Sequence, residues 1–316
     1  MASEGGTTAV VTALFGNLGI AVTKFVAFLL TASSSMLAES LHSVADTGNQ
    51  VLLLIGGKRA KRAATREHPF GFGRARYVYG FIVAVVLFTL GGLFALYEAW
   101  HKWAEPEPIT SWRWVPIAVL LVAIALEGYS LRTAVRESDK VRGNRSWPEF
   151  VRTTKSPELA VVLLEDFGAL LGLLFALAGV SLTLVTGDGR WDAAGSAVIG
   201  LLLVVIAVVL AVEMNSLLVG ESVSPRNRRA IEAALPGGHI ESIIHMRTLH
   251  LGPEEVLVAA KVAFRAGASA EEVATAIDDA ERRIREAVPI ATVIYLEPDL
   301  RRPAPEPAGT EPPAAP

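Results

Sequence analysis

Six long apolar segments decide what this chain can fold into, because a helix needs about 20 apolar residues to cross a lipid bilayer. They cover approximately residues 8–30, 36–57, 77–100, 114–131, 158–185 and 193–218. Of the 316 residues, 52% are hydrophobic and only 19% are charged, and the mean hydropathy is +0.42. The sequence therefore predicts an all-α bundle of six transmembrane helices, followed by a soluble domain in the more polar C-terminal part.

Basic residues in the connecting segments predict the orientation of this bundle. Residues 58–76 and 132–155 are rich in Lys and Arg, whereas the other connections are short and contain few basic residues. The positive-inside rule places these two basic connections in the cytoplasm. Six spans then place both termini in the cytoplasm as well. The first apolar segment contains Lys24 and follows no basic region, so we expect a retained helix and not a cleaved signal peptide.

The chain after residue 220 has the pattern of a small α+β domain. Helices are expected at about 225–235 and 269–287, and strands at 243–250, 256–264 and 291–296. This order is αββαβ, a ferredoxin-like arrangement that covers one face of a sheet with two helices. We expect three regions: a transmembrane domain (1–220), a cytoplasmic αββαβ domain (221–300) and a disordered Pro-rich tail (301–316).

Ionisable side chains interrupt two of the apolar segments. His42 and Asp46 are four residues apart, so they share one face of a helix, and Glu165 and Asp166 are adjacent in the fifth segment. Charges inside a bilayer are costly and usually functional. Imidazole and carboxylate groups bind divalent metals, while the absence of cysteine excludes thiolate ligands. We predict a metal site between the second and fifth helices, formed by His42, Asp46 and Asp166. Glu165 points about 100° away from Asp166 and joins only if the helix is distorted.

Other polar residues in the apolar segments admit simpler explanations. His42 and Asp46 themselves could merely form hydrogen bonds between helices. Glu39, one turn before His42, either continues an ion path or meets solvent at the outer interface. Asn17 favours an interhelical hydrogen bond, and Lys24 either reaches the interface or pairs with an acidic neighbour. Three glutamates near segment ends are interpreted as interfacial: Glu98, Glu127 and Glu213.

Together these motifs resemble the cation diffusion facilitator (CDF) family, the zinc-transporter-type cation efflux proteins. The matching stretches are SSSMLAESLHSVADTGNQ, HPFGFGRAR, LLEDFGALLG and WDAAGSAVIGLLL, followed by the αββαβ pattern, and they extend from about residue 8 to 300. The resemblance implies a tetrahedral site with two ligands at i and i+4 from each of two helices. One pair falls on His42 and Asp46, and the other on Val162 and Asp166. Because Val162 cannot bind metal, water, Glu165 or another residue must supply the fourth ligand.

The resemblance also implies a function and partners. It implies export of Zn²⁺, or of a related ion such as Mn²⁺, Fe²⁺ or Co²⁺, in exchange for protons, and a homodimer formed through the cytoplasmic domain. The family's loop site matches only at His68, so we expect it to be weak or absent. The family's regulatory site in the cytoplasmic domain matches at His245; His239 and His250 could compensate for missing histidines, but we expect no full dinuclear site. We expect no prosthetic group and no nucleic-acid partner, and a multi-pass protein in a bacterial cell membrane.

Two other classes stay open at this point. One is a proton-coupled carrier of a small solute that uses the same carboxylates. The other is a membrane metal sensor or scaffold that does not transport. An enzyme is not expected, because the sequence shows no nucleophile–base pair and its His and carboxylate residues lie in transmembrane segments.

Overall fold

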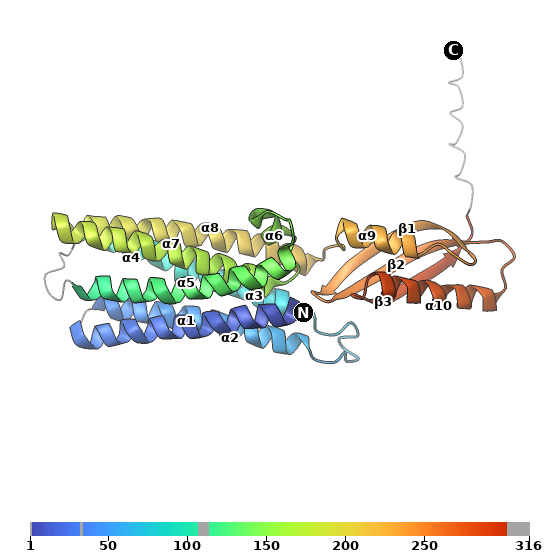
Figure 1. Cartoon of the computed structure of the whole chain (residues 1–316), viewed down its shortest axis with the longest axis horizontal. Helices are drawn as coiled ribbons and strands as arrows, with labels where there is room; N and C mark the ends of the chain where they lie inside the picture. Colours follow the sequence, from blue (N-terminus) through green and yellow to red (C-terminus); the bar gives the residue numbers. More distant parts are fainter. Residues whose placement is uncertain (1, 32–33, 107–113, 302–316) are drawn as a thin grey trace, which may run out of the picture. The chain divides into compact units, whose positions relative to one another are not determined.

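The computed structural model describes residues 2–31, 34–106 and 114–301, without the side chains of residues 2–5, 31, 34–39 and 41. The chain divides into two compact units, Met1–Val219 and Gly220–Pro316 (Figure 1). The first unit is helical and the second contains a sheet with helices. The predicted Pro-rich tail lies outside the described residues, apart from Arg301.

The first unit is built of helices. Their bounds are α1 (Ala2–Thr31), α2 (Ser34–Ala60), α3 (Ala75–Val86), η1 (Leu87–Leu93), α4 (Phe94–Ala104), α5 (Trp114–Arg142), α6 (Trp147–Thr153), α7 (Pro157–Thr186) and α8 (Arg190–Val219). The π-helical segment η1 joins α3 and α4 into one continuous rod. A capping box between Ser146 and Glu149 starts the short helix α6.

Five helical stretches in the described part of the chain are long and apolar enough to cross a membrane. They are Gly6–Leu30, Ala75–Ala104, Trp114–Arg142, Pro157–Thr186 and Arg190–Val219. They confirm the predicted membrane helical bundle, although six spans were expected. The remaining predicted span, residues 36–57, lies within α2, whose polar residues lower its hydropathy. Its 27 residues form a helix about 40 Å long, which is long enough to span a bilayer.

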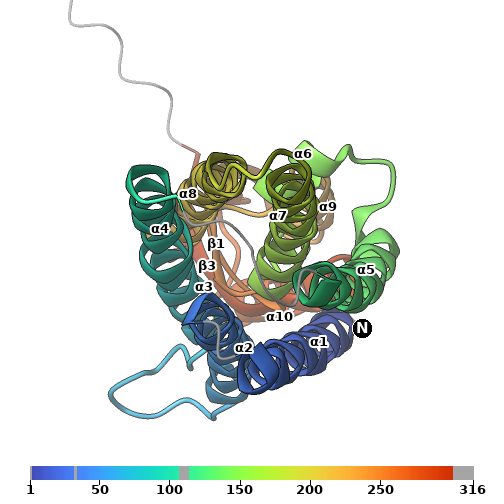
Figure 2. The ribbon, with the colours of Figure 1, turned by 90° about the vertical axis from the view of Figure 1, so that its left-hand side faces the viewer.

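The long helices form a closed ring when the bundle is viewed along its axis (Figure 2). In this ring α2 contacts α1 and α3, α8 contacts α3, α4 and α7, and α5 contacts α7 and α1. This order puts α2 and α7, the two helices with the predicted ligands, on opposite sides of the ring interior.

Glycines bring α7 and α8 into close contact. A Cβ atom on Gly179 would lie 2.8 Å from the carbonyl oxygen of Trp191, and one on Gly195 would lie 3.1 Å from that of Phe175. Small residues at such contacts let helix backbones approach each other inside a membrane. The α7–α8 pair therefore forms a tightly packed wall of the ring.

The second unit has the predicted αββαβ order. Its elements are α9 (Pro225–Ala234), β1 (Ile240–Gly252), β2 (Glu255–Phe264), α10 (Ala270–Ala287) and β3 (Ala291–Asp299). The sheet order is β1-β2-β3, with β1 and β2 antiparallel and β2 and β3 parallel. The parallel pair is connected through α10, as a crossover requires. A membrane helical bundle followed by a small α+β domain is thus confirmed.

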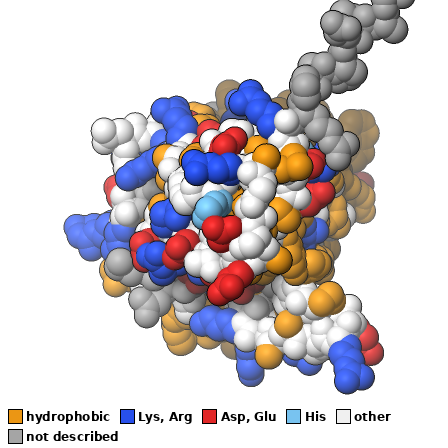
Figure 3. Space-filling view, turned by 90° about the vertical axis from the view of Figure 1, so that its right-hand side faces the viewer, with side chains coloured by type: hydrophobic (Ala, Val, Ile, Leu, Met, Phe, Trp, Pro, Cys, Tyr) orange, Lys and Arg blue, Asp and Glu red, His pale blue; other side chains and the backbone are white. Residues whose placement is uncertain are grey.

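The two faces of this sheet differ. Val258 is buried with Ile231 of α9 and Ile284 of α10, so the helices cover one face. Alternation along β2 puts Lys261 on the opposite face, where Tyr295 of β3 is 59% exposed. Lys and Arg side chains are interspersed with Asp and Glu over the surface seen in Figure 3. In the described part of this unit, the helices therefore cover only one side of the sheet.

Candidate metal centre

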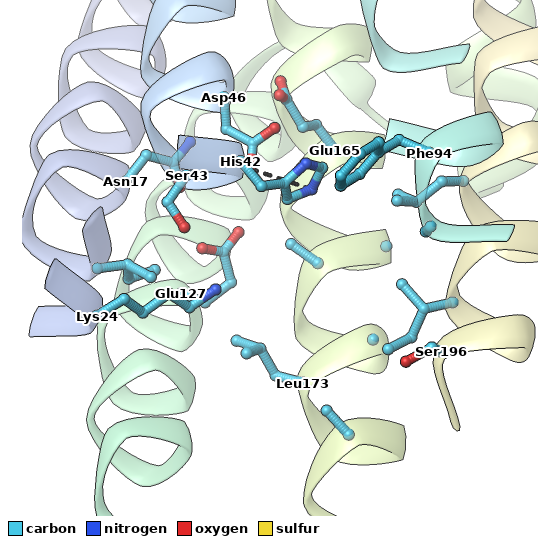
Figure 4. A pocket seen from close by; sticks show the side chains of 18 of the residues that line it. Asn17, Lys24, His42, Ser43, Asp46, Phe94, Glu127, Glu165, Leu173 and Ser196 are labelled. Carbon is cyan, nitrogen blue, oxygen red and sulfur yellow. Dashed lines mark ion pairs between the residues drawn. The ribbon is translucent and has the colours of Figure 1, made fainter. Parts of the chain in front are cut away.

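A cavity of about 160 Å³ lies inside the ring of helices (Figure 4). Its polar lining residues come from six helices: Asn17 and Lys24 of α1, His42, Ser43 and Asp46 of α2, Glu98 and Lys102 of α4, Glu127 of α5, Glu165 of α7 and Ser196 of α8. The cavity thus brings together His42, Asp46 and Glu165. Asp166 is not part of its lining.

His42 and Asp46 face the cavity from α2, as the four-residue spacing predicts. The Nε2 atom of His42 is 3.8 Å from Oδ2 of Asp46, which is too long for a hydrogen bond. Both side chains are about a quarter exposed (29% and 24%). The pair can therefore offer one nitrogen and one oxygen to a cation that enters the cavity.

Glu165 is held in place by two amide side chains of α2. Its Oε1 accepts a hydrogen bond from Nδ2 of Asn49, and its Oε2 accepts one from Nε2 of Gln50, both at 3.0 Å. The Asn49 and Gln50 side chains are almost completely buried. These bonds join α7 to α2 across the ring interior and fix the orientation of the Glu165 carboxylate.

Asp166 lies on the side of α7 that faces α5. Its Oδ2 accepts a hydrogen bond of 2.6 Å from the hydroxyl of Ser130. Its Oδ1 is buried and has no hydrogen-bond partner among the described residues. Val162, one turn earlier, is fully buried in the apolar core of the bundle. The different directions of Glu165 and Asp166 agree with the rotation of about 100° between successive helical residues.

Glu127 corrects the sequence interpretation. It was expected at an interface, but its side chain is only 2% exposed and lines the cavity. It is close enough to Asp46, Glu165 and Asp166 for their charges to interact. The apolar segment ended near residue 131, which put Glu127 close to its end, whereas α5 continues to Arg142. Glu127 therefore lies near the middle of its helix.

These groups converge on one cavity but are not assembled into a coordination sphere. In the part of the chain that the structure describes, no three His, Asp or Glu side chains are close enough to hold one metal ion together. The contributing helices α2, α5 and α7 would have to move closer, or water would have to complete the ligand set. Rearrangement of helices around a central site is what alternating access requires.

The other sequence candidates lie away from this cavity. His68 stacks on Phe72 with 4.5 Å between ring centroids, and its carbonyl oxygen accepts a hydrogen bond from the Gly71 backbone. This supports a structural role in the loop turn. His245 is exposed on β1 opposite Lys261, whose ammonium group pairs with Glu297 and Asp299. The side chain of Glu39 lies outside the described residues.

The helical unit matches a known domain by sequence. The family profile described as the cation efflux transmembrane domain covers residues 10–219. The chain belongs to the cation efflux family. This family membership confirms the resemblance to the zinc-transporter-type CDF proteins. It also establishes a multi-pass membrane protein of a transporter class, as distinct from an enzyme class.

Individual relatives in the cation efflux family carry informative names. "Proton-coupled zinc antiporter SLC30A9, mitochondrial" of Xenopus laevis is 32% identical over 245 residues, which are 76% of this chain and 44% of that protein. The Homo sapiens protein of the same name is 31% identical over 76% of this chain and 43% of its own length. "Metal tolerance protein C4" of Arabidopsis thaliana is 28% identical over 262 residues, 81% of this chain and 56% of the relative. The chain thus spans less than half the length of the first two relatives, and their mitochondrial names give no support to the bacterial membrane expected from the sequence.

Proposed function

We propose that the protein exports a divalent metal ion, with Zn²⁺ as the preferred ion, from the cytoplasm in exchange for protons. The observation that carries this proposal is the cavity where His42, Asp46, Glu127 and Glu165 converge within a cation efflux transmembrane domain. The names of the relatives, which include a proton-coupled zinc antiporter, support both the ion and the coupling. A sensor or scaffold would leave this buried polar cluster without a use.

The formal charge of the cavity suits a divalent cation. Its lining contains the four carboxylates of Asp46, Glu98, Glu127 and Glu165, and the two ammonium groups of Lys24 and Lys102. Acidic groups thus outnumber basic groups by two in the lining, and the neighbouring Asp166 adds a third. Because charges interact strongly where water is scarce, this excess favours entry of a cation over a neutral solute.

Unpartnered buried oxygens on α2 and α7 also support a cation. Asn49 Oδ1, Gln50 Oε1 and Asp166 Oδ1 are buried without hydrogen-bond partners among the described residues. An acceptor left in this condition costs about 1–3 kcal/mol. A metal ion, a proton or a water molecule that binds beside Glu165 would remove part of this cost. We propose that His42 and Asp46 of α2 hold the ion together with the α7 carboxylates Glu165 and Asp166.

The cavity position supports an alternating-access cycle. Its lining residues lie mainly in the half of the bundle near Glu98 and Lys102, which is the outer half in the orientation expected from the basic loops. The opposite half contains many of the buried apolar side chains of the bundle, such as Leu159, and a second cavity lined by Arg76 and Glu158. We propose that this conformation faces outward and that a second one opens to the cytoplasm. Protons and metal ions compete for the same imidazole and carboxylates, which couples the two fluxes.

The types of metal ligand in the cavity predict a preference among divalent metal ions, which a transport assay can measure. One imidazole with carboxylates suits Zn²⁺ but also admits Mn²⁺, Fe²⁺ and Co²⁺. We therefore expect proteoliposomes that are acidic inside to take up Zn²⁺ in preference to Mn²⁺, Fe²⁺, Co²⁺ and Cd²⁺. A proton-conducting ionophore should abolish the uptake, because it removes the gradient that drives exchange.

Two variants are compared in this assay: the double variant His42→Ala/Asp46→Ala, and the control variant His245→Ala. The double variant should lose uptake, whereas His245→Ala removes a histidine outside the membrane and should keep it. Uptake at the wild-type rate by the double variant, or no uptake of any of the five metals by the wild type, would contradict the proposal.

We further propose a homodimer formed through the second unit. Support comes from the resemblance and from the sheet face with the exposed Tyr295 that α9 and α10 do not cover. Light scattering of the detergent-solubilised protein should give twice the mass of one chain after correction for detergent. A mass of 33.6 kDa would rule out this assembly.

A further inference from the structure

Lys24 is an unexpected residue in a cavity for cations. It lies on α1, seven residues before the end of the helix at Thr31, which corresponds to a depth of about 10 Å. Its side chain is only 7% exposed and lines the same cavity as His42 and Asp46. A lysine that reached out to the membrane interface would be more exposed. The ammonium group is therefore part of the cavity.

The carboxylate of Glu127 is a charged neighbour of Lys24 in this cavity. Glu127 is 2% exposed on α5, and α5 packs directly against α1. The two side chains are close enough to interact electrostatically, and Figure 4 shows the end of Lys24 next to Glu127. Asn17 and Ser43 line the cavity alongside them. A buried carboxylate without a compensating charge is strongly unfavourable, so Lys24 stabilises Glu127 in the bundle.

We propose that Lys24 is a tethered cation that neutralises Glu127 in the absence of metal and weakens metal binding so that the ion can leave. This inference rests on the proposed function of the cavity as a metal path. Without Lys24 the lining would carry an excess of three negative charges and would hold a divalent ion more tightly. Because Lys24 belongs to the protein, its positive charge stays beside Glu127 in the cavity when the ion leaves.

The sharpest test compares zinc binding by the full-length protein in detergent, measured by calorimetry at one fixed pH. Lys24→Met keeps the length of the side chain and removes its charge, and it should tighten Zn²⁺ binding about tenfold. Lys24→Arg keeps the charge and should stay within about twofold of the wild type. Lys58→Met, which removes an exposed lysine of α2 outside the cavity, is the matched control and should leave the affinity unchanged.

Transport kinetics give a second readout that a purely structural lysine would not change in this way. In proteoliposomes, Lys24→Met should lower both the KM for Zn²⁺ and the maximal rate several-fold, because tighter binding slows release. Unchanged or weaker zinc binding by folded Lys24→Met would overturn the proposal. So would Lys24→Arg behaving like Lys24→Met, because then the charge would not matter.

A double-mutant cycle without metal tests the pairing itself. Lys24→Met should lower the thermal stability because it leaves Glu127 uncompensated, and adding Glu127→Gln should restore most of the loss. Additive effects of the two substitutions would overturn the pairing. Zinc binding by wild type but not by Asp46→Ala would uphold the proposed function even if Lys24 fails these tests. Absence of zinc binding by wild type would overturn the proposed function and this inference together.

Discussion

Replacing Glu165 by Gln is expected to lower zinc flux about a hundredfold or more while leaving the protein folded. The Glu165 carboxylate lines the cavity and accepts hydrogen bonds from both Asn49 and Gln50. The substitution keeps the size of the side chain and one acceptor oxygen, but it removes the negative charge that attracts a metal ion. One N–H group of the new glutamine amide then faces the amide N–H of Asn49 or Gln50, which is unfavourable. This local cost is offset because a charged carboxylate no longer has to be buried.

The measurement is initial zinc uptake into proteoliposomes, normalised to the amount of folded protein. Glu137→Gln is the matched control, because Glu137 pairs with Lys140 near the end of α5 and lies outside the cavity. Asp166→Asn should also lose most of the flux, because its unpartnered Oδ1 would no longer carry charge. Uptake by Glu165→Gln at more than half the wild-type rate would show that this carboxylate does not bind the transported ion.

The architecture could be predicted because hydropathy and strand alternation are local properties. Long apolar runs identify spanning helices wherever they pack. The predicted span at residues 36–57 corresponds to α2, although Asn49, Gln50 and other polar groups reduce the apolar character of this helix. Its polar side chains are tolerated because they face the ring interior and not lipid, which a single sequence cannot reveal.

The candidate site was harder to predict because it depends on how helices rotate. Sequence spacing placed His42 and Asp46 on one face, and the structure agrees. It could not tell which of Glu165 and Asp166 would face the cavity, since that depends on contacts with Asn49, Gln50 and Ser130 from other helices. For the same reason, Glu127 was wrongly interpreted as interfacial and two alternatives stayed open for Lys24. Only the packing of α1 against α5 brings these two side chains together.

A second large effect is expected where α3 and α7 begin, because Arg76 and Glu158 form a buried ion pair there. Arg76 Nε lies 3.1 Å from Glu158 Oε1, and the two side chains are 8% and 10% exposed. The Nε–H group makes no hydrogen bond among the described residues, so the attraction is mainly coulombic. The pair joins the first turn of α3 to the first turn of α7, where Glu158 also benefits from the helix dipole.

Arg76→Met should therefore reduce the free energy of unfolding by about 3–5 kcal/mol, because it leaves a buried carboxylate without its guanidinium partner. Adding Glu158→Gln should recover most of this loss, since the double variant contains neither buried charge. Chemical or thermal unfolding of the purified protein in detergent measures both effects, with Arg66→Met, an exposed loop substitution, as the control. If Arg76→Met unfolded like the wild type, or if Glu158→Gln added to its loss, charge compensation between these two side chains would not contribute to stability. The expected recovery in the double variant would show that the cost of Arg76→Met comes from the lost charge balance, and that apolar packing suffices to join the two helices once neither charge is buried.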